Sequence, residues 1–145
     1  MRKEFKATKS VAKARIYATS EGIHSIYLNG VNVTDEYFTP GWTAYDDRNT
    51  YLTYDVTKLV QSGDNALAAE IADGWHRGKF GFMNMYDNYS TTISLLAQLE
   101  ISYTDGSKDV IATDESWKVS TGEIVFGDIY DGSHLDFTKE QKGWK

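Results

Sequence analysis

The sequence predicts an all-β protein in which short strands pack as a β-sandwich or a barrel. Apolar and polar residues alternate with a period of two along most of the chain, which is typical of half-buried strands. Turn-forming residues, such as Asn29-Gly30 and the run 104–107, separate these segments. A length of 145 residues, of which 41% are hydrophobic and 25% charged, suits one folded domain. We therefore expect a single module over residues 1–145.

The predicted strands follow one another at short intervals. The first 15 positions hold six Lys and Arg residues against Glu4, and we interpret this basic stretch as the solvated face of a first strand. Segment 23–28 leads into Asn29-Gly30, a strong hairpin signal because both residues tolerate a positive φ, and 31–33 returns from it. The other predicted strands are 14–18, 51–54, 66–71, 92–103, 109–112, 116–120 and 124–126.

Only one segment, near 55–61, has the pattern of a helix. Asp55 could cap its start, and Ser62-Gly63 would end it within two turns. Two connections, 34–50 and 73–90, are long for a sandwich, and long connections are where binding sites tend to lie.

Charge and composition exclude several classes of function. The net charge is −6, and the basic stretch near the start is short and contains a single aromatic residue, Phe5, so a nucleic-acid partner is not expected. No apolar run is long enough to cross a bilayer, so no membrane partner is expected. The chain has no cysteine, and its three histidines, His24, His76 and His134, lack zinc-ligand spacing. No nucleophile motif or phosphate-binding loop is present, so we predict no catalytic residue.

The two long connections are rich in aromatic residues. Eleven of the 20 aromatic side chains lie in or beside them, mixed with acids, amides and arginines. Aromatic faces can cover the C–H face of a sugar while polar groups bond its hydroxyls, although the same rings could simply pack the loops. These rings are Tyr37, Phe38, Trp42, Tyr45, Tyr51, Tyr54, Trp75, Phe80, Phe82, Tyr86 and Tyr89.

Within the second connection, glycines bracket a Trp-His-Arg triplet in the segment 73–78. Trp75 could stack on a ligand ring while Arg77 donates to hydroxyls, or Trp75 could anchor the loop while Arg77 pairs with Asp73. The sequence leaves both open. Asn88 is a further candidate ligand contact.

Asp46-Asp47 in the first connection is the best candidate metal site. Adjacent acids in a turn can offer a hard cation such as calcium a carboxylate and a backbone carbonyl. Adjacent solvated acids are also common, so calcium is one of two open interpretations.

Several motifs, in order along nearly the whole chain, resemble the β-sandwich module in the N-terminal part of bacterial α-L-rhamnosidases. They are residues 26–30 (IYLNG), 37–43 (YFTPGWT), 51–57 (YLTYDVT), 73–81 (DGWHRGKFG), 113–118 (TDESWK) and 128–132 (DIYDG). The segment 73–78 departs from the family's D-G-W-Y-R-G at His76, which replaces a tyrosine. After Gly132 the chain also departs from the family's usual Glu-x-Tyr-Asp-Ala-Arg.

The resemblance implies a galactose-binding-domain-like jelly roll that is a fragment of a larger glycoside hydrolase. A separate (α/α)₆ domain, outside this chain, would hydrolyse terminal α-L-rhamnosides, so this chain alone would be inactive. The module would then be a non-catalytic carbohydrate-binding domain, or a purely structural one that docks on the catalytic domain and shapes its active-site rim. The chain shows no signal peptide, which places it in the bacterial cytoplasm or inside a longer exported protein.

The resemblance also implies a ligand set. In some members an Asp-Asn pair, a tryptophan and other loop groups hold calcium and L-rhamnose together. Asp46 and Asp47 take the position of that pair, with Asp47 replacing the asparagine, and Trp75 is the expected stacking ring. The implied partner is an L-rhamnose-containing glycan. Together with the residues singled out above, the candidate contacts are Trp75, Asp46, Asp47, Arg77 and Asn88.

Overall fold

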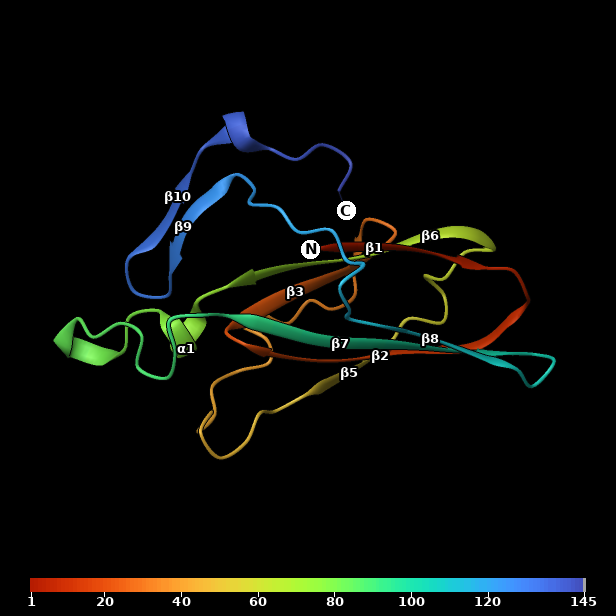
Figure 1. Cartoon of the computed structure of the whole chain (residues 1–145), viewed down its shortest axis with the longest axis horizontal. Helices are drawn as coiled ribbons and strands as arrows, with labels where there is room; N and C mark the ends of the chain where they lie inside the picture. The colour runs from red at the N-terminus through yellow and green to blue at the C-terminus, as the bar shows by residue number, and fades with distance from the viewer. Residues whose placement is uncertain (145) are drawn as a thin grey trace.

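The computed structural model is nearly all β, and its two antiparallel sheets face each other as a sandwich (Figure 1). The structure describes residues 1–144. Lys145 and the side chain of Phe82, one of the eleven rings named above, lie outside that description. The predicted β-sandwich is confirmed. Within the described residues no helix has the length and apolar character needed to span a membrane.

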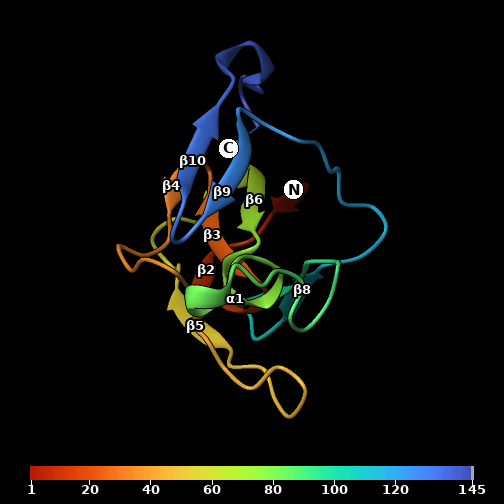
Figure 2. The same ribbon diagram turned by 90° about the vertical axis from the view of Figure 1, so that its left-hand side faces the viewer.

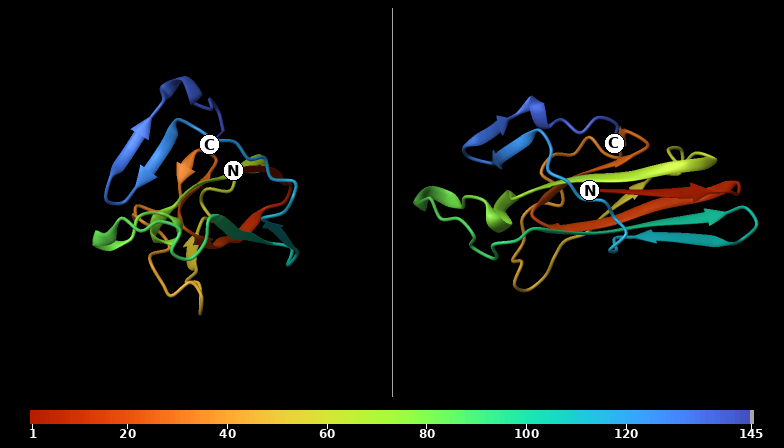
Figure 3. Two further views of the ribbon diagram at one scale, coloured as in Figure 1. Left: turned by 60° about the vertical axis from the view of Figure 1, so that its left-hand side comes forward. Right: turned by 45° about the horizontal axis from the view of Figure 1, so that its top comes forward.

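Each large sheet has four strands in the described part of the chain. One sheet has the order β1 (Arg2–Ala7), β6 (Gly63–Ala72), β3 (Ile23–Leu28) and β4 (Val31–Asn32). The other has the order β5 (Leu52–Asp55), β2 (Val11–Glu21), β7 (Ser94–Tyr103) and β8 (Lys108–Ala112). A separate hairpin, β9 (Ile124–Asp128) with β10 (Gly132–Leu135), belongs to neither sheet and stands apart from both in Figure 3.

The core lies between the two sheets and follows the period of two. On β3 the residues His24, Ile26 and Leu28 are buried and alternate with partly exposed ones. On β7 the alternate residues Leu95, Ala97, Leu99, Ile101 and Tyr103 are buried. Apart from His24, which is buried with them, these inward residues of both sheets belong to one apolar cluster. Because this alternation was visible in the sequence, most strands could be predicted from it.

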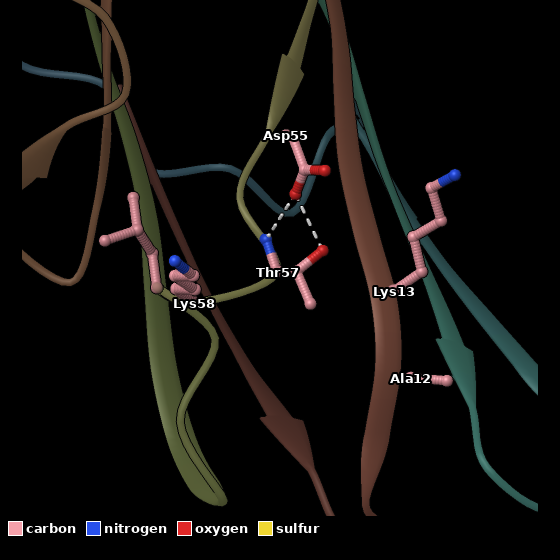
Figure 4. Close-up of a pocket in the computed structure, with 6 residues that line it drawn as sticks. Ala12, Lys13, Asp55, Thr57 and Lys58 are labelled. Atoms are coloured by element: carbon pink, nitrogen blue, oxygen red, sulfur yellow. Dashed lines mark hydrogen bonds between the residues drawn. The ribbon is translucent and has the colours of Figure 1, made fainter.

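The predicted helix at 55–61 is wrong, because this segment is a turn. The Asp55 carboxylate accepts hydrogen bonds from the Thr57 backbone N–H at 3.0 Å and from its hydroxyl at 2.7 Å (Figure 4). Such a bond to a residue two positions on replaces the first helical turn rather than capping it. Only one further turn, from Leu59 and Val60 back to the Val56 carbonyl, follows. The short helix is instead α1 (Gly74–Arg77), inside the second long connection.

Near the end of the chain, segment 116–120 is not a strand. Lys118 makes an isolated bridge to Arg2, while Trp117 is buried and donates its indole N–H to the Ala112 carbonyl at 2.9 Å. Two single-turn 3₁₀ helices complete the elements, η1 (Gly81–Met83) and η2 (Phe137–Lys139).

One end of the sandwich gathers three segments that are far apart in sequence. Figure 2 looks onto this end and shows α1, the connection 34–50 and the β9–β10 hairpin around it. We call this end, formed by 34–50 and 73–90, the rim.

Candidate functional site

The two long connections are joined at the rim by three packed rings. Tyr45, which is buried, meets the His76 ring edge-on at a centroid distance of 4.9 Å and the Tyr89 ring at 5.0 Å. His76 and Tyr89 lie nearly parallel, 5.9 Å apart. Burial, and then the neighbouring Tyr89, raise the pKa of Tyr45. These rings therefore hold the rim together, which is the packing role that the sequence left open.

A second group of rings faces solvent. The indoles of Trp42 and Trp75 lie nearly parallel with centroids 6.5 Å apart, and Phe38 and Phe80 pack edge-on against Trp75 at 6.0 Å and Trp42 at 4.8 Å respectively. Trp75 is half-buried, whereas Trp42 is 53% exposed. Trp75 was the ring predicted to stack on a ligand. The structure makes Trp42 the more open of the pair, a difference that no local sequence signal revealed.

Glycines set the position of α1 and its Trp-His-Arg triplet. Gly74 has φ +54°, and a Cβ there would come within 2.7 Å of the Ile23 side chain. A Cβ on Gly78 would lie 2.4 Å from the Gly74 carbonyl oxygen. The absence of a side chain at Gly74 therefore lets this turn approach the start of β3, and its absence at Gly78 lets the turn close on the Gly74 carbonyl.

Arg77 is paired with Asp73, as the packing interpretation predicted. Its guanidinium lies 2.6 Å from the Asp73 carboxylate, and it also donates to the Thr91 carbonyl at 3.4 Å. Both charged groups are partly exposed. Asn88 is exposed and donates its amide N–H to the Met85 carbonyl at 3.2 Å.

Asp46 and Asp47 lie in an exposed turn that follows Tyr45. The backbone N–H groups of Asp47 and Arg48 both donate to the Ala44 carbonyl, at 2.9 and 3.0 Å. Among the described residues, no group of three or more His, Asp or Glu side chains is arranged to hold a metal ion. The two aspartates fit calcium only in part, because its other oxygen ligands would have to be backbone carbonyls, water or ligand hydroxyls.

A polar clasp that sequence reasoning missed ties the hairpin to the rim. The backbone N–H of Lys79 donates to the Asp128 carboxylate at 2.8 Å, and the Lys79 ammonium lies 3.0 Å from the Asp131 carboxylate. Asp131 also accepts a hydrogen bond from the Tyr86 hydroxyl at 3.1 Å. Burial opposes ionisation of Asp128, but backbone N–H donors from Lys79, Tyr130 and Asp131 outweigh it and keep its pKa below the ordinary value. The partners are about 50 positions apart, so only the turn at 128–132 was visible in the sequence.

A hollow of about 630 Å³ lies away from the rim, between β2 and the turn after β5. Its walls are Ala12, Lys13, Asp55, Thr57, Lys58 and Leu59 (Figure 4). The Asp55 carboxylate there is bonded to Thr57, and these bonds lower its pKa. Because the Asp55 carboxylate is already hydrogen-bonded to Thr57 and no aromatic residue lines the hollow, it is a weaker candidate for a sugar-binding site than the rim.

The chain thus folds as a β-sandwich with an aromatic rim at one end. The family model described as "Alpha-L-rhamnosidase N-terminal domain" matches residues 9–145, and the chain belongs to this family.

Curated relatives agree with this membership. An α-L-rhamnosidase of Formosa agariphila is 41% identical over 145 residues, which are 99% of this chain and 16% of the relative. An α-L-rhamnosidase of Streptomyces avermitilis is 42% identical, over 99% of this chain and 14% of the relative. The chain thus spans about one seventh of these proteins.

Solved structures share the fold. The Streptomyces avermitilis α-L-rhamnosidase complexed with L-rhamnose superposes with a TM-score of 0.95 at 43% identity, over 99% of this chain and 14% of that one. The α-L-rhamnosidase of Aspergillus terreus superposes with a TM-score of 0.95 at 42% identity, over 99% of this chain and 17% of that one. A Pleurotus ostreatus lectin gives 0.54 at 20% identity over 83% of this chain and 28% of that one, which shows a common fold alone.

Proposed function

We propose that this chain is the non-catalytic carbohydrate-binding module of an α-L-rhamnosidase. It binds L-rhamnose-containing glycans at the rim, while a separate (α/α)₆ domain hydrolyses terminal α-L-rhamnosides. The observation that carries this proposal is the pair of nearly parallel indoles at the rim, exposed Trp42 and half-buried Trp75. They come from the two long connections, and the connection of Trp42 also holds Asp46 and Asp47. Aromatic faces of this kind cover the apolar face of a sugar ring.

The polar groups of the rim would orient the sugar. Asp46 and Asp47 follow Trp42 in the chain and are exposed, so their carboxylates are free of the core and can accept from hydroxyls. Arg77 and Asn88 offer N–H donors from the second connection, and Arg77 remains partly exposed beside Asp73. Calcium would sit at Asp46 and Asp47, where its positive charge would offset the two acids and add a ligand for hydroxyl oxygens.

Calorimetric titration with L-rhamnose tests this function. We expect saturable binding in the presence of calcium and much weaker binding after chelation. Trp42→Ala should weaken binding by about tenfold or more, equivalent to about 1.4 kcal/mol. Trp144→Ala is the matched control, because Trp144 packs against Tyr27 on β3 rather than at the rim, and it should bind as the parent does.

A flat titration of the parent protein with calcium present would contradict sugar binding. Binding that resists a chelator and persists in Asp46→Asn with Asp47→Asn would contradict the calcium site while leaving the sugar site standing.

The second candidate function is structural, with the module docking on the rest of an α-L-rhamnosidase. Exposed apolar residues on the β9–β10 hairpin favour it.

A further inference from the structure

The β9–β10 hairpin lacks the support that stabilises the other strands. Its strands pair with each other and with neither large sheet. A two-stranded hairpin is marginally stable in water unless a further surface packs against it. Its turn is held by the Lys79 clasp described above, and on its strands Phe126 contacts His134 at a ring distance of 5.1 Å.

The rest of the hairpin carries an exposed apolar surface. Ile124 is 49% exposed, Val125 48%, Leu135 53% and Phe137, in η2, 74%. Ile124 and Leu135 are register partners, so they lie side by side across the ladder. We call these four residues the hairpin patch. Exposed apolar side chains gathered on one short segment are candidates for a contact surface.

The relatives indicate what covers the patch. The family is an N-terminal domain, and the chain accounts for 14% to 17% of the α-L-rhamnosidases it matches at above 40% identity. Most of such a polypeptide therefore follows this module, and the patch lies within the last 22 residues that would lead to it. Residues 123–136 hold four acids and no lysine or arginine. Asp131 and Asp136 already pair with Lys79 and Lys139, so a basic border on the partner would complement the other two, Glu123 and Asp128.

We propose that the hairpin patch is the surface on which a following domain of the same polypeptide docks, through an apolar area bordered by Lys or Arg. This inference rests on the docking function named above and gives it a specific surface. Sugar binding at the rim is not required for it.

A chimera provides the test. This chain replaces the aligned segment of the 41% identical Formosa agariphila enzyme, and hydrolysis of nitrophenyl α-L-rhamnoside confirms that the chimera folds. Hydrogen exchange of peptides over 123–137 is then compared between the chimera and the isolated chain. We expect exchange at least tenfold slower in the chimera. Should the chimera be inactive, the intact relative is compared with its own isolated module at the aligned residues.

Matched leucine variants localise the contact. Leu135→Asp should remove most of that protection in the chimera, while Leu96→Asp, which changes a 63% exposed leucine on β7, should retain it. Equal exchange rates over 123–137 in the chimera and in the isolated chain would overturn the proposed surface. Equal effects of Leu135→Asp and Leu96→Asp on exchange would also overturn it. So would a dimer of the isolated chain in which 123–137 is protected.

Thermal unfolding separates the two ideas. Suppose that the module and the rest of the chimera unfold in one transition, while hydrogen exchange over 123–137 is not slowed. The module then docks on the rest of the polypeptide, but through a surface other than the hairpin patch. If they unfold as two independent transitions, the docking function itself is wrong.

Discussion

The imidazole of His24 lies in the interior of the sandwich, where both its ring nitrogens are close to hydroxyl groups. Nδ1 is 2.9 Å from the Ser20 hydroxyl and Nε2 is 3.3 Å from the Tyr54 hydroxyl. Its backbone also pairs with Thr39, at the start of the rim. Burial lowers the pKa of His24 from 6.5 to about 4. A neutral, buried histidine therefore connects the core to the rim.

This burial predicts a loss of stability in mild acid. Between pH 6.5 and pH 4 the unfolded chain binds a proton at His24 that the folded chain does not, so the free energy of unfolding falls as the pH falls. The shift corresponds to a loss of about 3 kcal/mol, complete near pH 4. Urea unfolding at several pH values measures it.

The histidine variants are matched for this test. His24→Gln should flatten the fall in the free energy of unfolding between pH 6.5 and pH 4. His134→Gln, at an exposed position, should leave that fall unchanged. The same pH slope in both variants would contradict the assignment to His24.

Residue identities at the rim were predictable, but their relative exposure was not. The sequence showed that aromatic residues gather in 34–50 and 73–90, and the family motif pointed to Trp75. Whether Trp75 or Trp42 faces solvent depends on how Phe38 and Phe80 pack around them, which is a contact between segments over 30 positions apart. Spacing along the chain carries no information about such packing.

At the scale of elements, the helix α1 depends on the absence of side chains at its glycines. Gly74→Ala should destabilise the protein by about 3 kcal/mol, because it adds a clash with Ile23 to the cost of a positive φ. Gly81→Ala is the control, since Gly81 has a similar φ of +63° with open space around its Cβ position, and it should cost about 1 kcal/mol.

Thermal unfolding of both glycine variants checks this expectation. Equal destabilisation by the two substitutions would show that φ alone matters and that the close approach to β3 is unimportant.

Strands were easier to predict than the helix for a physical reason. A strand buried on one face repeats every two residues, so β3 and β7 are visible locally. The pattern near 55–61 contained the right residues for a capped helix, but the Asp55 carboxylate bonded Thr57 instead. The pairing of β10 with β9 was missed because its four residues, Gly132–Leu135, are exposed and lack alternation.

At the scale of the molecule, the two sheets, the rim and the hairpin form a module that covers only 14% to 17% of the α-L-rhamnosidases it matches. A glycosidase places two carboxyl groups about 5–10 Å apart across the scissile bond. Asp73 of the rim and Asp131 of the hairpin turn are each held in an ion pair, with Arg77 and Lys79 respectively.

The isolated chain should therefore release no nitrophenol from nitrophenyl α-L-rhamnoside above the rate in buffer. Absorbance at concentrated protein measures this. Turnover that scales with protein concentration and is abolished by Asp46→Asn or Asp47→Asn would contradict a non-catalytic module and locate chemistry at the rim.

Family membership and sandwich architecture could both be predicted from the sequence, because ordered motifs and period-two patterns span nearly the whole chain. The Lys79 clasp could not, since it joins the rim to a hairpin about 50 positions away. That clasp has a mechanical consequence. It joins the surface proposed for the glycan to the surface proposed for a neighbouring domain through two rim residues, Lys79 and Tyr86. If sugar binding favours docking of the neighbouring domain through this contact, thermodynamic reciprocity requires that docking strengthen sugar binding by the same factor.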